Sequence, residues 1–350
     1  MTTTTSSSVM AREQSTEPSS TPSARLQAAR LAAIRRPVEA DLAAVDVRII
    51  ENLDSNAPLI RETGEYLIRQ GGKRLRPLLA LLAARAFGYD GREHVEIAVI
   101  IEFIHTATLL HDDVVDRSTM RRGSRTANSI WGDEVSVLVG DFLFSRAFQL
   151  MVEIGDLAIM RIMADATNII AEGEVMQLGS RHDPDTTEAR YLDVVACKTG
   201  KLFEAAARVG AVLAGRGKAD EQRMAQFGAS LGVAYQLVDD ILDYRGSAAT
   251  IGKNIGDDLA DGQPTLPLIH AMRVGDEKGV RTVRDAILRG DVEQLPNLIE
   301  IVETSGGIEY TSASARGYVD RARDALRDIP DNRFRAALAS FADFVVERTY

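Results

Sequence analysis

The chain has 350 residues, of which 45% are hydrophobic and 26% charged, a balance typical of a soluble globular protein. Its 41 lysine and arginine residues stand against 51 aspartate and glutamate residues, and the resulting net charge of −10 argues against nucleic-acid binding. The single cysteine, Cys197, excludes an internal disulfide and a cysteine-rich zinc site, and it favours a reducing, cytoplasmic compartment.

Residues 1–38 are the first predicted segment, a leader rich in serine, threonine and proline. Its first two dozen residues carry almost no large apolar side chains, so they cannot bury enough surface to offset the entropy lost on ordering. We therefore expect the leader to be disordered. A transit peptide is the alternative, because five arginines occur from Arg12 to Arg36, but Glu13 and Glu17 argue against it, since transit peptides are poor in acidic residues.

From residue 39 onward the pattern is helical almost everywhere. Apolar residues recur at spacings of three and four in 75–87, 135–153 and 158–178, and the alternating pattern of β-strands is missing. The segment 95–110 is apolar nearly all round, as expected for a helix in the middle of a bundle. It contains Glu102 and His105, and no uninterrupted apolar run approaches the roughly 18 residues of a membrane span. Residues 39–350 are predicted to form one all-α domain, a single large helical bundle with no transmembrane segment.

A basic loop, GGKRLRP at residues 71–77, leads into one of the apolar helices. Pro77 is tolerated in the first turn of that helix. This loop is predicted to bind an anion such as a phosphate group. The binding groups would be glycine backbone amides, a helix N-terminus and the side chains of Lys73 and Arg76.

Two aspartate-rich motifs carry most of the chemistry, HDDVVD at residues 111–116 and DDILD at residues 239–243. The first and last aspartates of each are four residues apart, so on a helix they share one face, about 6 Å apart. These pairs are Asp112 with Asp116, and Asp239 with Asp243. Both motifs lie in otherwise apolar helices, where clustered like charges are costly unless a cation compensates them. A solvated helix face would explain one such motif, but two favour a site for a hard cation, most simply Mg²⁺.

Further basic residues accompany each aspartate motif. Arg121 and Arg122 follow the first, and Lys198 and Lys253 flank the second. Because Mg²⁺ held by few protein carboxylates is usually completed by substrate phosphates, the combination predicts a pocket for diphosphates bridged by Mg²⁺.

With these motifs in this order, the chain resembles the trans-isoprenyl diphosphate synthases of the long-chain polyprenyl type. The resemblance runs from the loop at 71–77 to GDDLADGQPTLPL at 256–268. It implies the isoprenoid synthase fold, a helical bundle with a central cavity. It also implies an Mg²⁺-dependent prenyltransferase that adds isopentenyl diphosphate repeatedly to an allylic primer, farnesyl or geranylgeranyl diphosphate. The expected products are octaprenyl to decaprenyl diphosphates, of quinone side-chain length, made by a homodimer that contacts a membrane transiently for product release.

The resemblance also implies roles for single residues. Asp112, Asp116 and Asp239 would hold several Mg²⁺ ions, with Asp113, Asp240 and Asp243 as further candidates. The residues expected to contact the allylic diphosphate are Arg121, Lys198 and Lys253. Those expected to bind isopentenyl diphosphate are Gly72, Lys73, Arg76, His105 and Arg122. Thr199 and Gln236 would line the reacting carbons, where their dipoles can stabilise an allylic cation.

Product length is expected to depend on the helix turn before the first aspartates. Ala107 and Thr108 are small where short-chain members of the family carry aromatic residues, so the product tunnel should be open there, and Met163 is a candidate for its floor. A geranylgeranyl diphosphate synthase is the alternative activity. A non-catalytic subunit of a heteromeric synthase is a second alternative. Such a subunit is expected to have lost aspartates of the motifs or residues of the basic loops, and this chain retains them all.

Two other metal sites are disfavoured. Glu102 and His105 form half of a di-iron motif, but the required second Glu-x-x-His is missing from the sequence. The aspartate motifs also lack the alternating ligand spacing and central glycine of a calcium-binding loop.

Overall fold

The structure is a computed structural model that describes residues 22–348 except 71, 122 and 246–255. The helices are α1 (Pro22–Arg35), α2 (Glu39–Asn52), α3 (Pro58–Arg69), α4 (Leu75–Ala86), α5 (Glu93–Val115), α6 (Ala127–Trp131), α7 (Asp133–Ile154), α8 (Leu157–Leu178), α9 (Glu188–Val195), α10 (Lys201–Leu213), α11 (Lys218–Arg245), α13 (Asp257–Ala260), α14 (Leu266–Val274), α15 (Glu277–Arg289), α16 (Leu295–Thr304), α17 (Gly307–Ala325) and α18 (Arg333–Val346). Short turns of other helix types are η1 (Arg36–Val38), the π-helical η2 (Ala196–Gly200) and η3 (Val292–Gln294). Strands β1 (Met120–Arg121) and β2 (Ser124–Arg125) pair antiparallel.

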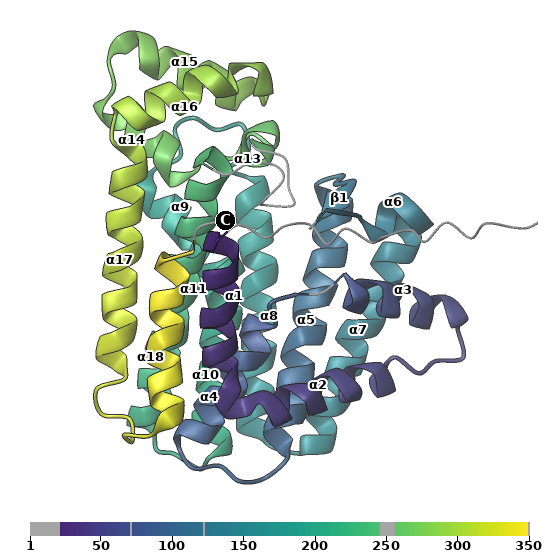
Figure 1. The fold of residues 1–350 in the computed structure, drawn as a ribbon. Coiled ribbons are helices and arrows are strands. Elements are labelled where there is room, and N and C mark those ends of the chain that lie inside the picture. Colours follow the sequence, from purple (N-terminus) through teal and green to yellow (C-terminus); the bar gives the residue numbers. More distant parts are fainter. Residues whose placement is uncertain (1–21, 71, 122, 246–255, 349–350) are drawn as a thin grey trace, which may run out of the picture.

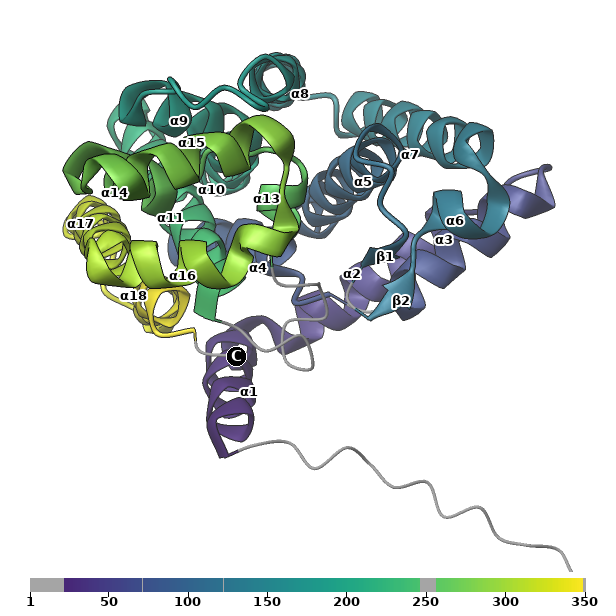
Figure 2. The same cartoon turned by 90° about the horizontal axis from the view of Figure 1, so that it is seen from above.

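The long helices stand side by side and form one bundle (Figure 1). Helix α5 packs between α4 and α7, α10 packs on α4 and α11, and α17 packs on the other side of α11. Seen from above, α14 to α16 cover one side of the bundle, and α3, α6 and the β1–β2 hairpin lie at the other (Figure 2). The prediction of an all-α helical bundle is confirmed.

Helix α4 lies in the core, and all of its residues except Arg76 and Arg85 are buried. Leu78, Leu79, Leu81 and Leu82 are all fully buried. Helices α10 and α11 approach each other closely at Gly228, where an added Cβ would stand 2.2 Å from the carbonyl oxygen of Phe203. This close contact holds the second aspartate motif, on α11, beside the π-helical turn η2 that precedes α10.

The disordered leader predicted for residues 1–38 is wrong for residues 22–38, which form α1 and η1. Leu31, Ile34 and Val38 recur at spacings of three and four and are buried against the rest of the protein. Helix α1 packs on α18, at the opposite end of the sequence. Residues 1–21 lie outside the described residues.

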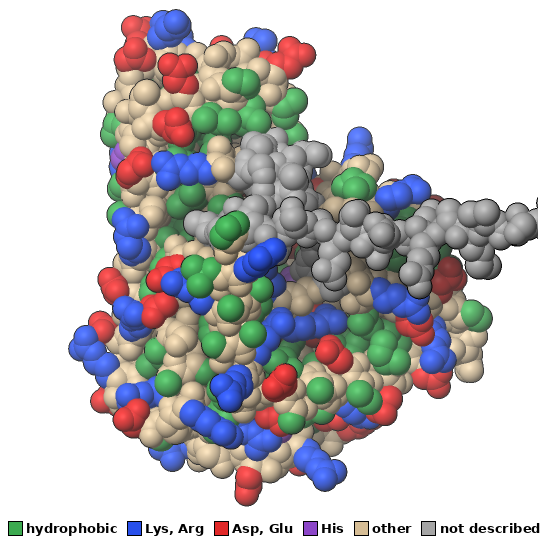
Figure 3. Space-filling view, in the orientation of Figure 1, with side chains coloured by type: hydrophobic (Ala, Val, Ile, Leu, Met, Phe, Trp, Pro, Cys, Tyr) green, Lys and Arg blue, Asp and Glu red, His purple; other side chains and the backbone are tan. Residues whose placement is uncertain are grey.

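Among the described helices, α5 and α7 are each long and apolar enough to cross a membrane, judged by length and composition. In α5, 67% of the most apolar window is buried inside the protein, as in the core helix of a bundle, and in α7 the share is 39%. The face of the molecule drawn in Figure 3 carries acidic and basic side chains interspersed with apolar ones.

Candidate active site

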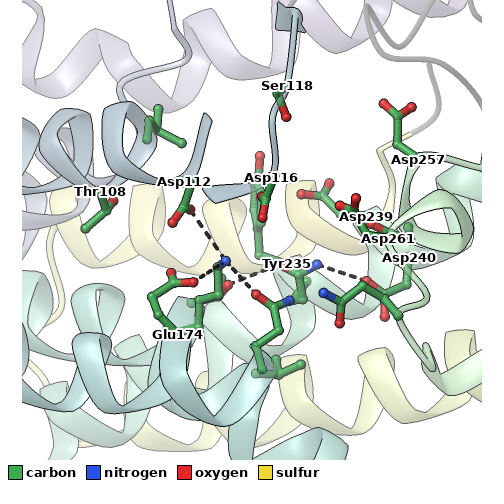
Figure 4. A pocket seen from close by; sticks show the side chains of 18 of the residues that line it. Thr108, Asp112, Asp116, Ser118, Glu174, Tyr235, Asp239, Asp240, Asp257 and Asp261 are labelled. Carbon is green, nitrogen blue, oxygen red and sulfur yellow. Dashed lines mark hydrogen bonds and ion pairs between the residues drawn. The ribbon is translucent and has the colours of Figure 1, made fainter. Parts of the chain in front are cut away.

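A cavity of about 950 Å³ collects residues from both aspartate motifs and the basic loop. Its walls come from the start of α4, the second half of α5, α8, η2, α11 and α13. Asp112 and Asp116 stand at the end of α5, and Asp239 faces them from α11 across the cavity (Figure 4). The two motifs therefore form opposite poles of one pocket.

At the first pole, Asp112 and Asp116 face the cavity, whereas Asp113 is buried in the protein. The backbone N–H of Asp116 donates to the carbonyl of Asp112 at 2.8 Å, so the two residues are one helical turn apart. Asp113 is buried and forms an ion pair with Arg121, whose Nη2 is 2.7 Å from the carboxylate. Burial raises the pKa of Asp113 although Arg121 opposes this shift. Asp113 thus holds Arg121 at the rim of the cavity.

At the second pole, Asp239, Asp240 and Asp243 all line the cavity, and Asp240 is also buried. Asp240 accepts hydrogen bonds from the hydroxyl of Tyr191 and, at 2.9 Å, from the side-chain amide of Gln236. Burial, followed by the nearby charge of Asp258, raises the pKa of Asp240. Asp240 therefore orients Gln236 while it lines the cavity itself.

Each cavity-facing carboxylate of the two motifs is close to a donor from the protein. Lys198 Nζ lies 3.5 Å from Asp112, and Arg181 pairs with Asp116. Arg348, two residues from the carboxyl end, lies 2.9 Å from Asp239, stacks on the ring of Tyr235 and has a side chain only 2% exposed. Asp243 accepts a hydrogen bond from a backbone N–H, that of Gly256, at 3.2 Å.

The carboxylates suit a metal ion that is shared with a substrate. Among the described residues, no group of three His, Cys, Asp or Glu side chains could hold a metal ion without other ligands. Mg²⁺ commonly binds through one or two carboxylates and takes its remaining oxygens from water and substrate phosphates. Asp112 with Asp116, and Asp239 with Asp243, supply that number at each pole. The oxygen-only donor set fits Mg²⁺ bound together with a diphosphate.

Lys198 is held in the cavity wall by α8. Its Nζ donates to Glu174 at 2.6 Å and to Gln177 at 2.7 Å (Figure 4). Burial, followed by the charge of Asp112, raises the pKa of Glu174 to about 7. Burial lowers the pKa of Lys198, but Asp112 and Glu174 outweigh it and the pKa is raised, so the ammonium stays charged. The next residue, Thr199, donates to the side-chain oxygen of Gln236 at 3.1 Å, so η2 presents both predicted residues to the cavity.

Residues 72–76 of the basic loop all line the cavity, and so does Glu102. Gly72, Lys73 and Arg76 line the cavity, and Arg76 Nη1 is 3.0 Å from Nε2 of His105. The guanidinium of Arg76 also lies 4.5 Å from the ring centroid of Phe203. Arg74, which has a left-handed backbone conformation with φ +43°, pairs with the buried Glu102. Glu102 is therefore an ion-pair partner, which accounts for the half di-iron motif.

Most predicted site residues meet at this cavity. Those that line it are Gly72, Lys73, Arg76, His105, Thr108, Asp112, Asp116, Arg121, Lys198, Thr199, Gln236, Asp239, Asp240 and Asp243. Arg122 and Lys253 lie outside the described residues. Ala107 and Met163 are almost fully buried in the main core and are not among the residues that line the cavity. Ile170, two turns beyond Met163 on α8, does line it.

Sequence reasoning missed the partners that hold these side chains in place. Glu174 and Gln177 are three residues apart on α8 and so share a face, a signal that was available in the sequence. Arg181, Tyr191 and Arg348 carry no such signal, because each meets its aspartate only through the fold.

Comparison with known proteins agrees with this geometry. Residues 57–302 match the family model described as polyprenyl synthetase. The chain belongs to this family. Over 309 residues it is 48% identical to an octaprenyl diphosphate synthase of Escherichia coli (strain K12), covering 88% of this chain and 96% of the relative. The match confirms the predicted family, and the chain is a prenyltransferase.

Two solved structures of family members are similar over nearly the whole chain. A decaprenyl diphosphate synthase from Rhodobacter capsulatus superposes with a TM-score of 0.86 at 45% identity, covering 91% of this chain and 98% of that one. A polyprenyl synthase from Caulobacter crescentus CB15, complexed with calcium and isoprenyl diphosphate, gives 0.88 at 44% identity with the same coverage. The isoprenoid synthase fold expected from the sequence is confirmed.

Proposed function

We propose that this prenyltransferase condenses isopentenyl diphosphate repeatedly with farnesyl or geranylgeranyl diphosphate. The products are all-trans octaprenyl to decaprenyl diphosphates, whose prenyl groups become quinone side chains. The observation that carries the proposal is one cavity that joins two carboxylate poles and a basic loop to an apolar wall. The similar proteins named octaprenyl and decaprenyl diphosphate synthases support the length of the product.

Asp112, Asp116, Asp239 and Asp243 are the residues that would hold Mg²⁺ ions. When bound, the ions supply positive charge that offsets the charge of a departing diphosphate. Lys198 and Arg121 stand beside the first pole and bind the same allylic diphosphate, while Lys73, Arg76 and His105 bind isopentenyl diphosphate.

The reaction begins when the bond between C1 and oxygen of the allylic diphosphate breaks and the electron pair leaves with the diphosphate. The double bond of isopentenyl diphosphate attacks the resulting allylic cation, a new carbon–carbon bond forms, and a proton passes to the released diphosphate. Thr199 and Gln236, already hydrogen-bonded to each other, direct their dipoles at the cation. Water would trap the cation, so the reacting carbons must lie in a dry part of the cavity.

The apolar wall suits a growing hydrocarbon chain. Thr108, Leu109, Ile170 and Leu202 line the cavity, and none of these four is aromatic. A chain whose diphosphate is held at Asp112 can therefore extend past Thr108 along α5.

We also propose a homodimer that forms through α7 and α8. Leu138 and Val152 on α7 are 65% and 66% exposed, and Leu157 and Val175 on α8 are 78% and 69% exposed. Large apolar side chains exposed on adjacent helices are typical of protein–protein interfaces. Light scattering of the wild type and of the double variant Leu138→Glu, Val152→Glu tests this: the wild type should have the mass of a dimer and the variant that of a monomer.

We propose that the enzyme is located in the cytoplasm and contacts a membrane transiently. A single cysteine, with no disulfide needed for folding, suits the cytoplasm. The product is a long hydrocarbon with a charged end, so transient contact with a membrane would allow its release.

One assay tests the proposed activity. Purified protein is incubated with Mg²⁺, farnesyl diphosphate and labelled isopentenyl diphosphate, and products are separated by chain length; omission of Mg²⁺ and the variant Asp239→Asn are the controls. We expect label in octaprenyl to decaprenyl products only when Mg²⁺ and Asp239 are present. Products that end at geranylgeranyl diphosphate would instead establish the alternative short-chain activity, and absence of incorporation would refute the proposal.

A further inference from the structure

Arg181 lies at the first carboxylate pole. It belongs to none of the sequence motifs, and the proposed reaction assigns it no role. It follows the end of α8, and its guanidinium forms an ion pair with Asp116. The two side chains are only 17% and 18% exposed, so this pair is much less screened by water than a surface pair.

The backbone around Arg181 is anchored on both sides. The N–H of Arg181 donates to the carbonyl of Gln177 at 3.1 Å, and the N–H of the next residue, His182, donates to the carbonyl of Gly262 at 2.9 Å. The second bond brings the segment next to Asp261, which also lines the cavity (Figure 4).

Arg181 therefore stands near two carboxylates. Asp261 is half-buried; burial and then the charge of Asp116 raise its pKa, and the charge of Arg181 opposes this shift. A guanidinium that left Asp116 would still have a carboxylate within electrostatic range. Only its long, flexible side chain would need to move, because the anchored backbone can stay in place.

The ion pair conflicts with metal binding at the same group. Mg²⁺ requires close oxygen ligands at about 2.0–2.1 Å in octahedral geometry. The carboxylate oxygen of Asp116 that accepts from Arg181 cannot hold the guanidinium and a metal ion in the same place. Binding of a metal ion at Asp116 must therefore displace Arg181 or work against its charge.

We propose that Arg181 is an exchangeable counterion of Asp116, which neutralises this carboxylate in the metal-free enzyme and moves toward Asp261 when a divalent cation binds. Arg181 thereby sets the metal concentration at which the first pole fills. This inference rests on the proposed role of Asp116 as a metal ligand and adds a residue that opposes the metal.

The test measures Mn²⁺ binding to the substrate-free protein by electron paramagnetic resonance, counting only the binding that Asp116→Asn abolishes. Arg181→Gln should tighten this binding about tenfold, the equivalent of about 1.4 kcal/mol. Arg181→Lys should give a smaller gain, because an ammonium makes a single-point contact with the carboxylate in place of a planar fork. Thermal unfolding of each variant checks that the fold is kept.

The matched control is Arg284→Gln. Arg284 on α15 pairs with Asp185, four residues after Arg181 in the same connecting segment, and both side chains of that pair are exposed. This variant removes the same charge and also loosens the segment, yet Mn²⁺ affinity should stay within about twofold, because exposed pairs are worth little.

A double-mutant cycle separates exchange at Asp116 from a general effect of charge. In the Asp116→Asn background, Arg181→Gln should leave the remaining Mn²⁺ binding unchanged. Unchanged or weaker binding in the single Arg181→Gln variant would overturn the inference, and so would an equal gain in both backgrounds. Neither result affects the proposed function, which fails only if the wild type does not elongate prenyl chains in the presence of Mg²⁺.

Discussion

Replacing Thr108 with tyrosine should shorten the product. Thr108 lies four residues before Asp112 on α5, which places it about 6 Å along the helix from the carboxylate. Its side chain lines the cavity, half-buried, and its hydroxyl donates to the carbonyl of His105 at 2.8 Å. A tyrosine would extend an aromatic ring into the passage that a chain held at Asp112 must follow. Because neighbouring helices are packed at crystal-like density, they cannot move aside. Growth from farnesyl diphosphate should stop at geranylgeranyl diphosphate, the product of the first condensation.

The matched control is the neighbouring residue. Ala107 is fully buried in the core and does not line the cavity, so Ala107→Phe inserts a ring of similar size into packed side chains. Overpacking of this kind costs about 1–3 kcal/mol of unfolding free energy. We expect a lower melting temperature with the length of the product unchanged.

Both variants are assayed with labelled isopentenyl diphosphate, chromatography of the products and thermal unfolding. Full-length products from Thr108→Tyr would show that the chain leaves the cavity by another route. Equal shortening by Ala107→Phe would show that the passage lies on the face of α5 that the structure places in the core.

Three further variants test the site and the core. Asp112→Asn should lower kcat by about 10²–10³-fold, the loss typical of one transition-state electrostatic contact, with the circular dichroism spectrum unchanged; near-normal turnover in saturating Mg²⁺ would contradict a catalytic first pole. Arg76→Ala should raise the KM for isopentenyl diphosphate far more than that for farnesyl diphosphate, because Arg76 lies on the basic loop; equal increases would mean that the two anion sites are assigned wrongly. Gly228→Ala should lower the unfolding free energy by at least about 1–3 kcal/mol, because its Cβ meets the carbonyl of Phe203 and backbone cannot give way; chemical denaturation with an unchanged midpoint would show that α10 and α11 can separate without cost.

The bundle and the two poles could be predicted because their signals are local. Aspartates four residues apart share a helix face wherever the helix lies, and a segment that is apolar all round must be buried. The prediction for residues 22–38 is wrong because the helix there depends on a contact with a distant segment, which no local signal reveals. Leu31 and Ile34 are too few to indicate a stable helix alone, and their burial depends on the packing of α1 against α18, which is distant in sequence.

The cavity wall and the counterions could not be predicted in this way. Helical periodicity indicates that Ala107, Thr108 and Met163 are on buried faces, but it cannot distinguish a face in the core from one that lines a cavity. The pairs formed by Arg348 and Arg181 join segments far apart in the chain. Their partners depend on how the helices pack, which charge patterns do not encode.

The repeated aspartate at the start of each motif has a geometric explanation. Successive residues on a helix are rotated by about 100°, so the second aspartate points away from the face that the first and the fifth share. Asp113 and Asp240 are accordingly both buried, where a carboxylate is tolerated only if donors surround it. Asp113 is held by Arg121, and Asp240 by Tyr191 and Gln236. All three donors, Arg121, Tyr191 and Gln236, line the cavity themselves. The second aspartate thus positions a side chain for the substrate, and the pair Asp-Asp combines a cavity-facing ligand with a buried anchor.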